Sequence, residues 1–494
     1  MIIFLAGCKK DWLEINDDPN NPKEVTPEFL FTSGVASTAA VVGGYYNLLG
    51  MFWSQHVTQS NTSNQYKYID SYSILTTDFA RQWNELYGGA LLDFKILKEK
   101  AKEINNNQLI YMTTVMECYV WQILTDLYGS IPFNEALRFE SDNILNPKYD
   151  SPETVYDSIT ARLKSLDKIE FSKISDNYIK YDLIFSKESK TLKIEDWVRF
   201  KNTLLLKIYL RQMYIRPELA QSGIQELYSQ GALFLDKDAK LDIFVDEPSK
   251  DNPLYSEDRR NLNTTRNIKA SATLFYYLEA NGDPRIYYIY DFTKAAMMPL
   301  PQGGNSIPNT DDGILSDDVP VLYLDPKDPV FFLSHAESLF LQAEAVAKGW
   351  GIGDAKALYD EAVSVSFLKY EEDASSFIQT AGVYEFPSTG TFEDQQKAII
   401  MQKWISLAGS EGIEAFFETN RTKYPIVSSV IYTIGGLNSD YNIWSGGELM
   451  YSISGVTGYN AFPKRLIYPN TEQDRNVNCP KGELITSKVW WDVK

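Results

Sequence analysis

Residues 334–367 read SHAESLFLQAEAVAKGWGIGDAKALYDEAVSVSF and predict two helices joined by a short turn. Ser334 and Glu337 have the spacing of a capping box, in which each side chain accepts a hydrogen bond from the backbone N–H of the other residue. Apolar residues then recur at helical spacing on one face. Gly349 is expected to end the first helix, because glycine adopts a left-handed conformation without steric cost, and Asp354 is expected to cap the second. The stretch therefore predicts a helical hairpin.

Small residues at the predicted contact would let the two helices approach closely. Ala343, Ala355 and Ala362, together with Tyr359, stand at the offsets of a tetratricopeptide helix pair, a unit of about 34 residues. Phe367 stands where that unit usually closes with proline, so an ordinary antiparallel helix pair is the alternative. Further helical patterns occupy residues 27–50, 76–104, 108–128, 151–168, 196–216, 270–280, 391–408 and 411–420.

Three long segments lack such periodicity and predict loops. They lie near 236–267, 299–330 and 425–494, and the second is rich in Pro, Gly and Asp, which favours a surface insertion. The sequence therefore predicts an all-α fold: a tetratricopeptide-like helical repeat body with long irregular loops, formed by a single domain over 27–494.

The composition excludes some classes of function. The 494 residues carry a net charge of −19, and such a field repels phosphate backbones, so nucleic-acid binding is not expected. Aromatic residues make up 14% of the chain, including 32 tyrosines, which can build both a core and flat contact surfaces. The three cysteines do not form a disulfide framework, and the sequence leaves open whether Cys118 and Cys479 pair. No apolar run reaches the roughly 18 residues of a spanning helix.

The N-terminus has the features of a lipoprotein signal. Residues 1–8, MIIFLAGC, end in Leu-Ala-Gly-Cys, and small residues before a cysteine are what a lipoprotein signal peptidase requires. The preceding stretch is shorter than a full signal peptide, whose apolar region alone spans about 7–15 residues. We expect Cys8 to be lipidated, to anchor the protein to a membrane surface. Residues 9–26, rich in Asn, Asp and Pro, are expected to form a tether.

Catalytic and metal motifs are weak. Only His56 and His335 occur, which argues against most metal sites and against a Ser-His or Cys-His pair, although His56 could contact a ligand. Residues 165–168 fit S-x-x-K and 175–177 fit S-D-N, but no K-T-G follows. The acidic pairs at 311–312 and 317–318 lack EF-hand spacing, which favours a solvated loop over a calcium site. We expect no catalytic residues, no metal and no cofactor.

Several stretches together resemble one family. They are LAGC (5–8), NDDPNNPKEVTPEFLFTSG (16–34), LTDLYGSIPFNEAL (124–137), EDWVRFKNTLLLKIYLR (195–211), SHAESLFLQAEAVAKGW (334–350), IIMQKWISLAGSEGIEAFFETNRTKYP (399–425), FPKRLIYP (462–469) and the closing VWWD. In this order they resemble the SusD/RagB outer-membrane lipoproteins of Bacteroidetes, in the branch that opens with DPNNP. The resemblance covers nearly the whole chain.

The resemblance implies a function as well as a fold. It implies a non-catalytic lipoprotein on the outer surface of the outer membrane, which captures oligosaccharides, or in some members peptides, and delivers them to a SusC-like TonB-dependent transporter. It further implies that helices 334–367 and 391–420 lie at or near the transporter. The alternatives are a surface glycoside hydrolase on a helical scaffold, which would need two carboxyl groups about 5–10 Å apart beside an aromatic platform, and a peptide-binding member of the family.

The expected binding residues come from two loops that mix aromatic and polar side chains, because sugars offer flat apolar faces edged by hydroxyls. Residues 52–75 and 440–451 have this composition and lack strong helical periodicity. We expect aromatic stacking and hydrogen bonding from eight residues in them: Trp53, Gln55, Asn64, Tyr66, Tyr68, Tyr441, Asn442 and Trp444. Whether the two loops meet in space cannot be read from the sequence.

Overall fold

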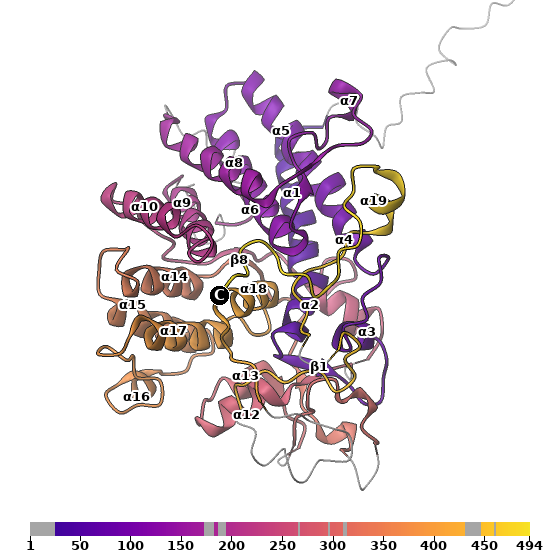
Figure 1. The fold of residues 1–494 in the computed structure, drawn as a ribbon, viewed down its shortest axis with the longest axis vertical. Helices are drawn as coiled ribbons and strands as arrows, with labels where there is room; N and C mark the ends of the chain where they lie inside the picture. Colours follow the sequence, from indigo (N-terminus) through magenta and orange to yellow (C-terminus); the bar gives the residue numbers. More distant parts are fainter. Residues whose placement is uncertain are drawn as a thin grey trace, which may run out of the picture.

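The fold is a body of packed helices with only short strands, as Figure 1 shows for the computed structural model. The structure describes residues 25–171, 182–185, 194–264, 267–294, 297–309, 314–429, 446–458 and 461–494. The expected signal at 1–8 and nearly all of the tether at 9–26 lie outside these ranges. The all-α prediction is confirmed.

Helices follow one another along one side of the molecule, from α5 and α8 through α9 and α10 to α14, α15 and α17 (Figure 1). The α-helices are α1 (Pro27–Val42), α2 (Tyr45–Trp53), α3 (Lys67–Asp70), α4 (Ala80–Asn84), α5 (Leu92–Glu103), α6 (Asn107–Tyr128), α7 (Phe139–Asp142), α8 (Pro152–Ser165), α9 (Ile194–Arg211), α10 (Pro217–Ser229), α11 (Pro253–Tyr255), α12 (Ala272–Ala280), α13 (Ile286–Ile289), α14 (His335–Ala347), α15 (Ala355–Leu368), α16 (Ser375–Ile378), α17 (Phe392–Ser406), α18 (Gly412–Thr422) and α19 (Asn470–Arg475). The described residues also form two π-helical turns, η2 (Glu85–Leu91) and η5 (Ser256–Arg260), and three 3₁₀ turns, η3 (Leu166–Lys168), η6 (Gly304–Ser306) and η7 (Ser316–Asp318).

In the described part of the chain the strands are short and pair antiparallel in three small sheets. They are β1 (Val57–Gln59), β2 (Ile131–Pro132), β3 (Tyr149–Asp150), β4 (Ala239–Leu241), β5 (Ile268–Ala270), β6 (Tyr290–Asp291), β7 (Val321–Leu322) and β8 (Val330–Leu333). One sheet has the order β1-β5-β7-β6, and β2 pairs with β3 and β4 with β8. These pairings tie the loop segments to the helical body.

The hairpin predicted at 334–367 forms as α14 and α15. Ser334 Oγ accepts a hydrogen bond from the Glu337 N–H (3.3 Å), Gly349 follows α14 with φ of 74°, and Asp354 Oδ1 accepts from the N–H groups of Lys356 (2.9 Å) and Ala357 (3.2 Å). The predicted small residues lie in the contact, since Ala343 and Ala362 are fully buried beside Tyr359. Phe367, in place of the usual proline, is also buried there.

The capping-box prediction for Ser334 is only half right. The Ser334 N–H donates to Glu411 Oε1 (3.2 Å), whereas the Glu337 carboxylate turns into the core, where it lies 3.2 Å from both Lys207 Nζ and Lys403 Nζ. Leaving a buried carboxylate unpaired costs more free energy than leaving one N–H at a helix start without a side-chain cap. The Glu337 carboxylate therefore pairs with the two lysines. A complete capping box occurs instead at Thr391, at the start of α17.

A buried cluster of charged side chains joins five helices, and we call it the ionic core. It lies where α6, α9, α14, α17 and α18 meet, and its members are Asp126, Lys207, Arg211, Glu337, Glu344, Lys403, Glu414, Glu418 and Arg421. Arg421, for example, donates to Glu344 and Glu418 at 2.6 Å each. Because buried charges are tolerated only when paired, these contacts fix how the helices sit against one another.

Several predicted boundaries differ from the structure. The helix expected over 27–50 is interrupted at Gly43 and Gly44, which separate α1 from α2. The segment expected over 299–330 as a surface insertion is partly buried, because Leu300, Ile307 and Val319 pack in a small cluster with Ala272 and Met450.

The described residues show the state of two cysteines and whether any helix could span a membrane. Cys118 and Cys479 are separate thiols, so no disulfide joins them. In the part of the chain that the structure describes, no helix is long and apolar enough to cross a membrane.

Candidate functional site

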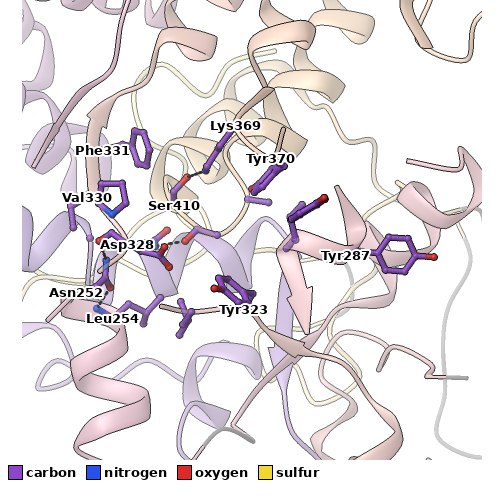
Figure 2. A pocket seen from close by; sticks show the side chains of 18 residues that line it. Asn252, Leu254, Tyr287, Tyr323, Asp328, Val330, Phe331, Lys369, Tyr370 and Ser410 are labelled. Atoms are coloured by element: carbon purple, nitrogen blue, oxygen red, sulfur yellow. Dashed lines mark hydrogen bonds between the residues drawn. The ribbon is translucent and has the colours of Figure 1, made fainter. Parts of the chain in front are cut away.

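A cavity of about 310 Å³ lies between the helical repeats and the strand-bearing loops (Figure 2). Its walls come from six segments that are far apart in sequence: residues 43–47, 252–254, 287–289, 323–331, 369–370 and 408–410. Its volume is at the lower end of the range for small-ligand pockets, about 300–1,000 Å³. The cavity is therefore large enough to be a candidate ligand site.

Aromatic rings form much of its wall. Tyr288 and Tyr370 stack with ring centroids 5.1 Å apart and planes at 20°, and the Tyr288 hydroxyl donates to Glu372 Oε1 (2.8 Å), which holds the ring in place. Tyr287, Tyr288 and Tyr323 are 68%, 40% and 51% exposed, so their rings are open to a ligand. Fixed, exposed rings of this kind suit a ligand with a flat apolar face.

A positively charged group stands beside the rings. Lys369 Nζ donates to Ser410 Oγ (3.2 Å) and lies 5.0 Å from the centroid of the Phe331 ring and 5.4 Å from that of Tyr370 (Figure 2). These distances are within the range of a cation–π contact. The ammonium is therefore held at the wall, where it can also donate to a ligand oxygen.

The opposite wall is fixed by polar contacts. Asn252 caps α11 through Oδ1 and donates from Nδ2 to the Asp328 carbonyl (2.9 Å), while Asp328 Oδ2 accepts from the Asp325 N–H (2.8 Å). Partial burial raises the pKa of the Asp328 carboxyl above its ordinary value, with Asp325 adding to the rise and the Asp325 N–H and Lys369 opposing it. Asp328 is the single carboxylate among the described residues that line the cavity, whereas hydrolysis of a glycosidic bond uses two.

Three residues of the predicted platform lie in the core. Trp53 is 4% exposed, packs on Phe416 with centroids 4.9 Å apart and donates from Nε1 to the Ile69 carbonyl (3.2 Å). Gln55 is fully buried and accepts from the Met450 N–H (2.9 Å), and Tyr66 is 1% exposed. In this structure none of the three offers a surface to a ligand.

Buried hydrogen bonds explain why the segment 52–75 packs inward. The Asp70 carboxylate accepts from Thr58 Oγ1 (2.9 Å), the Gln59 N–H (3.0 Å) and Gln302 Nε2 (2.5 Å). Burial raises the pKa of Asp70 to about 6, and these hydrogen bonds limit the rise. Burial also lowers the pKa of His56 to about 3, so this histidine is a neutral, packed residue.

The other predicted residues have different positions. Asn64 is exposed and Tyr68 is half-buried against Phe79 (centroids 6.5 Å apart), and neither lines the cavity. Tyr441, Asn442 and Trp444 lie outside the described residues, as does the lipidation residue Cys8. The acidic pair 311–312 lies outside them too, and Asp318 is paired with Lys294 (2.5 Å). Within the described ranges no group of three or more His, Cys, Asp or Glu side chains could hold a metal ion.

The cavity's own aromatics were missed, although the sequence holds a signal for them. Tyr287 and Tyr288 follow the loop 281–285, NGDPR, in the run IYYIY (286–290), and Tyr323 precedes the turn DPKDP (325–329). Aromatics next to such turns are candidates for exposed rings, because binding residues tend to sit on loops carried by a rigid body.

Comparison with known proteins identifies the family. Residues 19–443 match the SusD-like family described as starch-binding and associating with the outer membrane. The chain belongs to the SusD-like family. The predicted family is thus confirmed, and its members are binding proteins rather than enzymes, which sets aside the glycoside hydrolase alternative. No curated protein matches the chain.

Solved structures share the fold over nearly the whole length. A Bacteroidetes SusD-like protein, AC2a, is similar with a TM-score of 0.73 and 20% identity, over 95% of this chain and 100% of that one. A chitin-binding protein has a TM-score of 0.71 and 22% identity over 95% and 100% of the two chains. A chitin-binding SusD homologue from Flavobacterium johnsoniae has a TM-score of 0.69 and 20% identity over 94% and 98%.

Proposed function

We propose that this SusD-like protein binds an oligosaccharide in the cavity beside Tyr288 and Tyr370. The observation that carries the proposal is the pair of stacked, partly exposed rings next to the positioned ammonium of Lys369. A sugar ring can lie on the aromatic faces while its hydroxyls bond to Lys369, Ser410 and the nearby backbone. Family membership and the chitin-binding relatives support a carbohydrate ligand.

Removing the Tyr288 ring should weaken sugar binding by about 1–3 kcal/mol, or roughly 5- to 150-fold, because the ligand would lose a stacking surface. We would first titrate the wild-type protein by calorimetry with N-acetylchito-, malto- and cello-oligosaccharides and a mixed peptide pool, and then repeat the measurement for Tyr288→Ala with the best ligand.

Two variants act as controls. Tyr288→Phe keeps the ring and should retain most of the affinity, and Phe139→Ala removes an exposed aromatic on α7, away from the cavity, and should leave it unchanged. Wild-type affinity in folded Tyr288→Ala would place the site elsewhere. Binding of peptides but of no glycan would favour the peptide-binding alternative.

We further propose that the protein delivers its ligand to a SusC-like TonB-dependent transporter, with the helices 334–367 and 391–420 at or near the contact. The family's association with the outer membrane supports this partnership. Co-purification with a transporter encoded beside the gene would support it, and a transporter that never co-purifies from mild detergent would count against it.

The proposed membrane attachment is a lipid on Cys8. It rests on the Leu-Ala-Gly-Cys sequence, which precedes a polar segment. Acyl chains on a cysteine can hold a protein at a membrane surface, and two such chains make the attachment stable. Expressed in its native host with its full signal, the protein should fractionate with outer membranes, and Cys8→Ala should move it to the soluble fraction. A variant that stays with the membranes would show that another part of the chain attaches it.

A further inference from the structure

A second cavity, of about 590 Å³, adjoins the first and shares two wall residues with it, Tyr323 and Leu324. Tyr323 directly follows β7, and its N–H donates to the Ile289 carbonyl (2.9 Å), so its backbone is fixed to the segment that carries Tyr287 and Tyr288. Its ring is half exposed and belongs to both walls. Tyr323 therefore lies in the wall that the two cavities share.

Acidic groups from both cavities lie near the Tyr323 hydroxyl. Partial burial raises its pKa, and Asp325, Asp328 and Asp291 raise it further. Asp328 lines the first cavity and Asp291 lines the second, so charges on either side of the ring act on one hydroxyl.

The second cavity differs from the first in chemistry. Its lining includes the polar residues Asn263 and Thr264 and the exposed Asp291. Arg259 closes it from behind, since it is paired with Asp258 and donates from Nη2 to the Leu322 carbonyl (2.7 Å). One part of the groove is therefore aromatic and the next is polar.

We propose that the second cavity is a polar subsite that continues the binding groove past Tyr323, so that the ligand is an extended oligosaccharide chain. This inference rests on the proposed function of the first cavity. One sugar unit stacks beside Tyr288 and Tyr370, the chain passes over the ring of Tyr323, and further units bond through their hydroxyls to Asn263, Thr264 and Asp291. The site then selects for chain length as well as for the sugar.

The test is the dependence of affinity on chain length. We would titrate the protein with N-acetylchito- and cello-oligosaccharides from the monosaccharide to the hexasaccharide. The hexasaccharide should bind about tenfold more tightly than the disaccharide, equivalent to about 1.4 kcal/mol. Val321→Trp would fill the second cavity from β7, where strands accept aromatic residues, and Asp291→Ala would remove a polar group without filling it. Both should reduce the ratio of the two affinities toward one.

The control is Val477→Trp, which makes the same change at an 82% exposed valine that lines neither cavity, and it should keep the wild-type ratio. The second subsite would be overturned if the hexasaccharide bound no better than the disaccharide, or if the ratio of the two affinities stayed at the wild-type value in both Val321→Trp and Asp291→Ala. The effect of Tyr288→Ala tests the first cavity independently. If neither series binds at any length, the same titration is run with malto-oligosaccharides, and a protein that binds none of the three at any length would contradict the proposed function and the subsite with it.

Discussion

Replacing Arg211 with methionine should lower the free energy of unfolding by about 3–5 kcal/mol. Arg211 lies at the centre of the ionic core: Nε is 3.1 Å from Asp126, Nη2 is 2.7 Å from Glu414 and Nη1 is 2.5 Å from Glu418. Its guanidinium also lies 5.3 Å from the ring centroid of Phe417. Methionine fills much of the same space but leaves three buried carboxylates without their shared cation.

The pKa shifts in the ionic core explain why Arg211→Met should lower the free energy of unfolding rather than raise it. Burial alone would lower the pKa of Arg211, but Glu414, Asp126 and Glu418 raise it well above its ordinary value. Burial raises the pKa of Glu418, yet Arg421, Lys403 and Arg211 together bring it well below its ordinary value. The folded state thus depends on both signs of charge being present, and removing one cation exposes the desolvation cost of the remaining anions.

Denaturant unfolding at neutral pH measures the effect. Arg81→Met is the matched control, since Arg81 pairs with Glu257 at 3.3 Å but its side chain is 78% exposed, and such a pair contributes only about 0–1 kcal/mol. Adding Asp126→Asn to Arg211→Met should recover part of the loss, because Asp126, unlike Glu414 and Glu418, pairs with no second cation among the described residues. Equal losses for Arg211→Met and Arg81→Met would show that the ionic core does not hold the helices together.

Local signals made much of the fold predictable. The cap at Asp354, the stop at Gly349 and the start of the helix predicted at 151–168 each depend on a few neighbouring residues, and the structure has them where the sequence predicts. The interruption at Gly43–Gly44 was missed, because the apolar pattern continues across it. Ion-pair partners that are distant in sequence could not be predicted. Nothing near Glu337 in the sequence indicates that its carboxylate faces Lys207 and Lys403 rather than its own helix start.

The candidate site was less predictable for the same reason. A loop that mixes aromatic and polar residues was read as exposed, yet in 52–75 the polar groups satisfy one another and the rings pack inside, as Asp70 and Trp53 show. Conversely, the cavity brings Tyr288 beside Tyr370 only because α13 meets the end of α15 in space. Composition identifies segments able to bind a sugar, but only the tertiary packing decides which rings stay exposed.

The second large effect concerns the contact between α2 and α18, which pack backbone against backbone. A Cβ added at Gly50 would lie 2.1 Å from the Gly412 carbonyl carbon and 2.2 Å from the Ile413 nitrogen. Asn47 locks the same contact, because its Oδ1 accepts from the Gly412 N–H (2.8 Å) and its Nδ2 donates to the Gly409 carbonyl (3.2 Å). Neither helix can accommodate a methyl group without moving.

Gly50→Ala should therefore destabilise the protein by about 3 kcal/mol, the upper end of the usual cost of overpacking, because the obstructing atoms are backbone. Gly88→Ala is the same substitution in the helical turn η2, where an added Cβ meets nothing within 4 Å. There alanine restricts the unfolded chain and should stabilise by about 0.4–1 kcal/mol. Unfolding midpoints of the two variants should move in opposite directions, and a Gly50→Ala protein as stable as wild type would mean that α2 and α18 do not approach this closely. Because Asn47 and Gly409 also line the first cavity, a forced separation of the two helices should weaken sugar binding in Gly50→Ala as well, which calorimetry with the ligand used for Tyr288→Ala would detect.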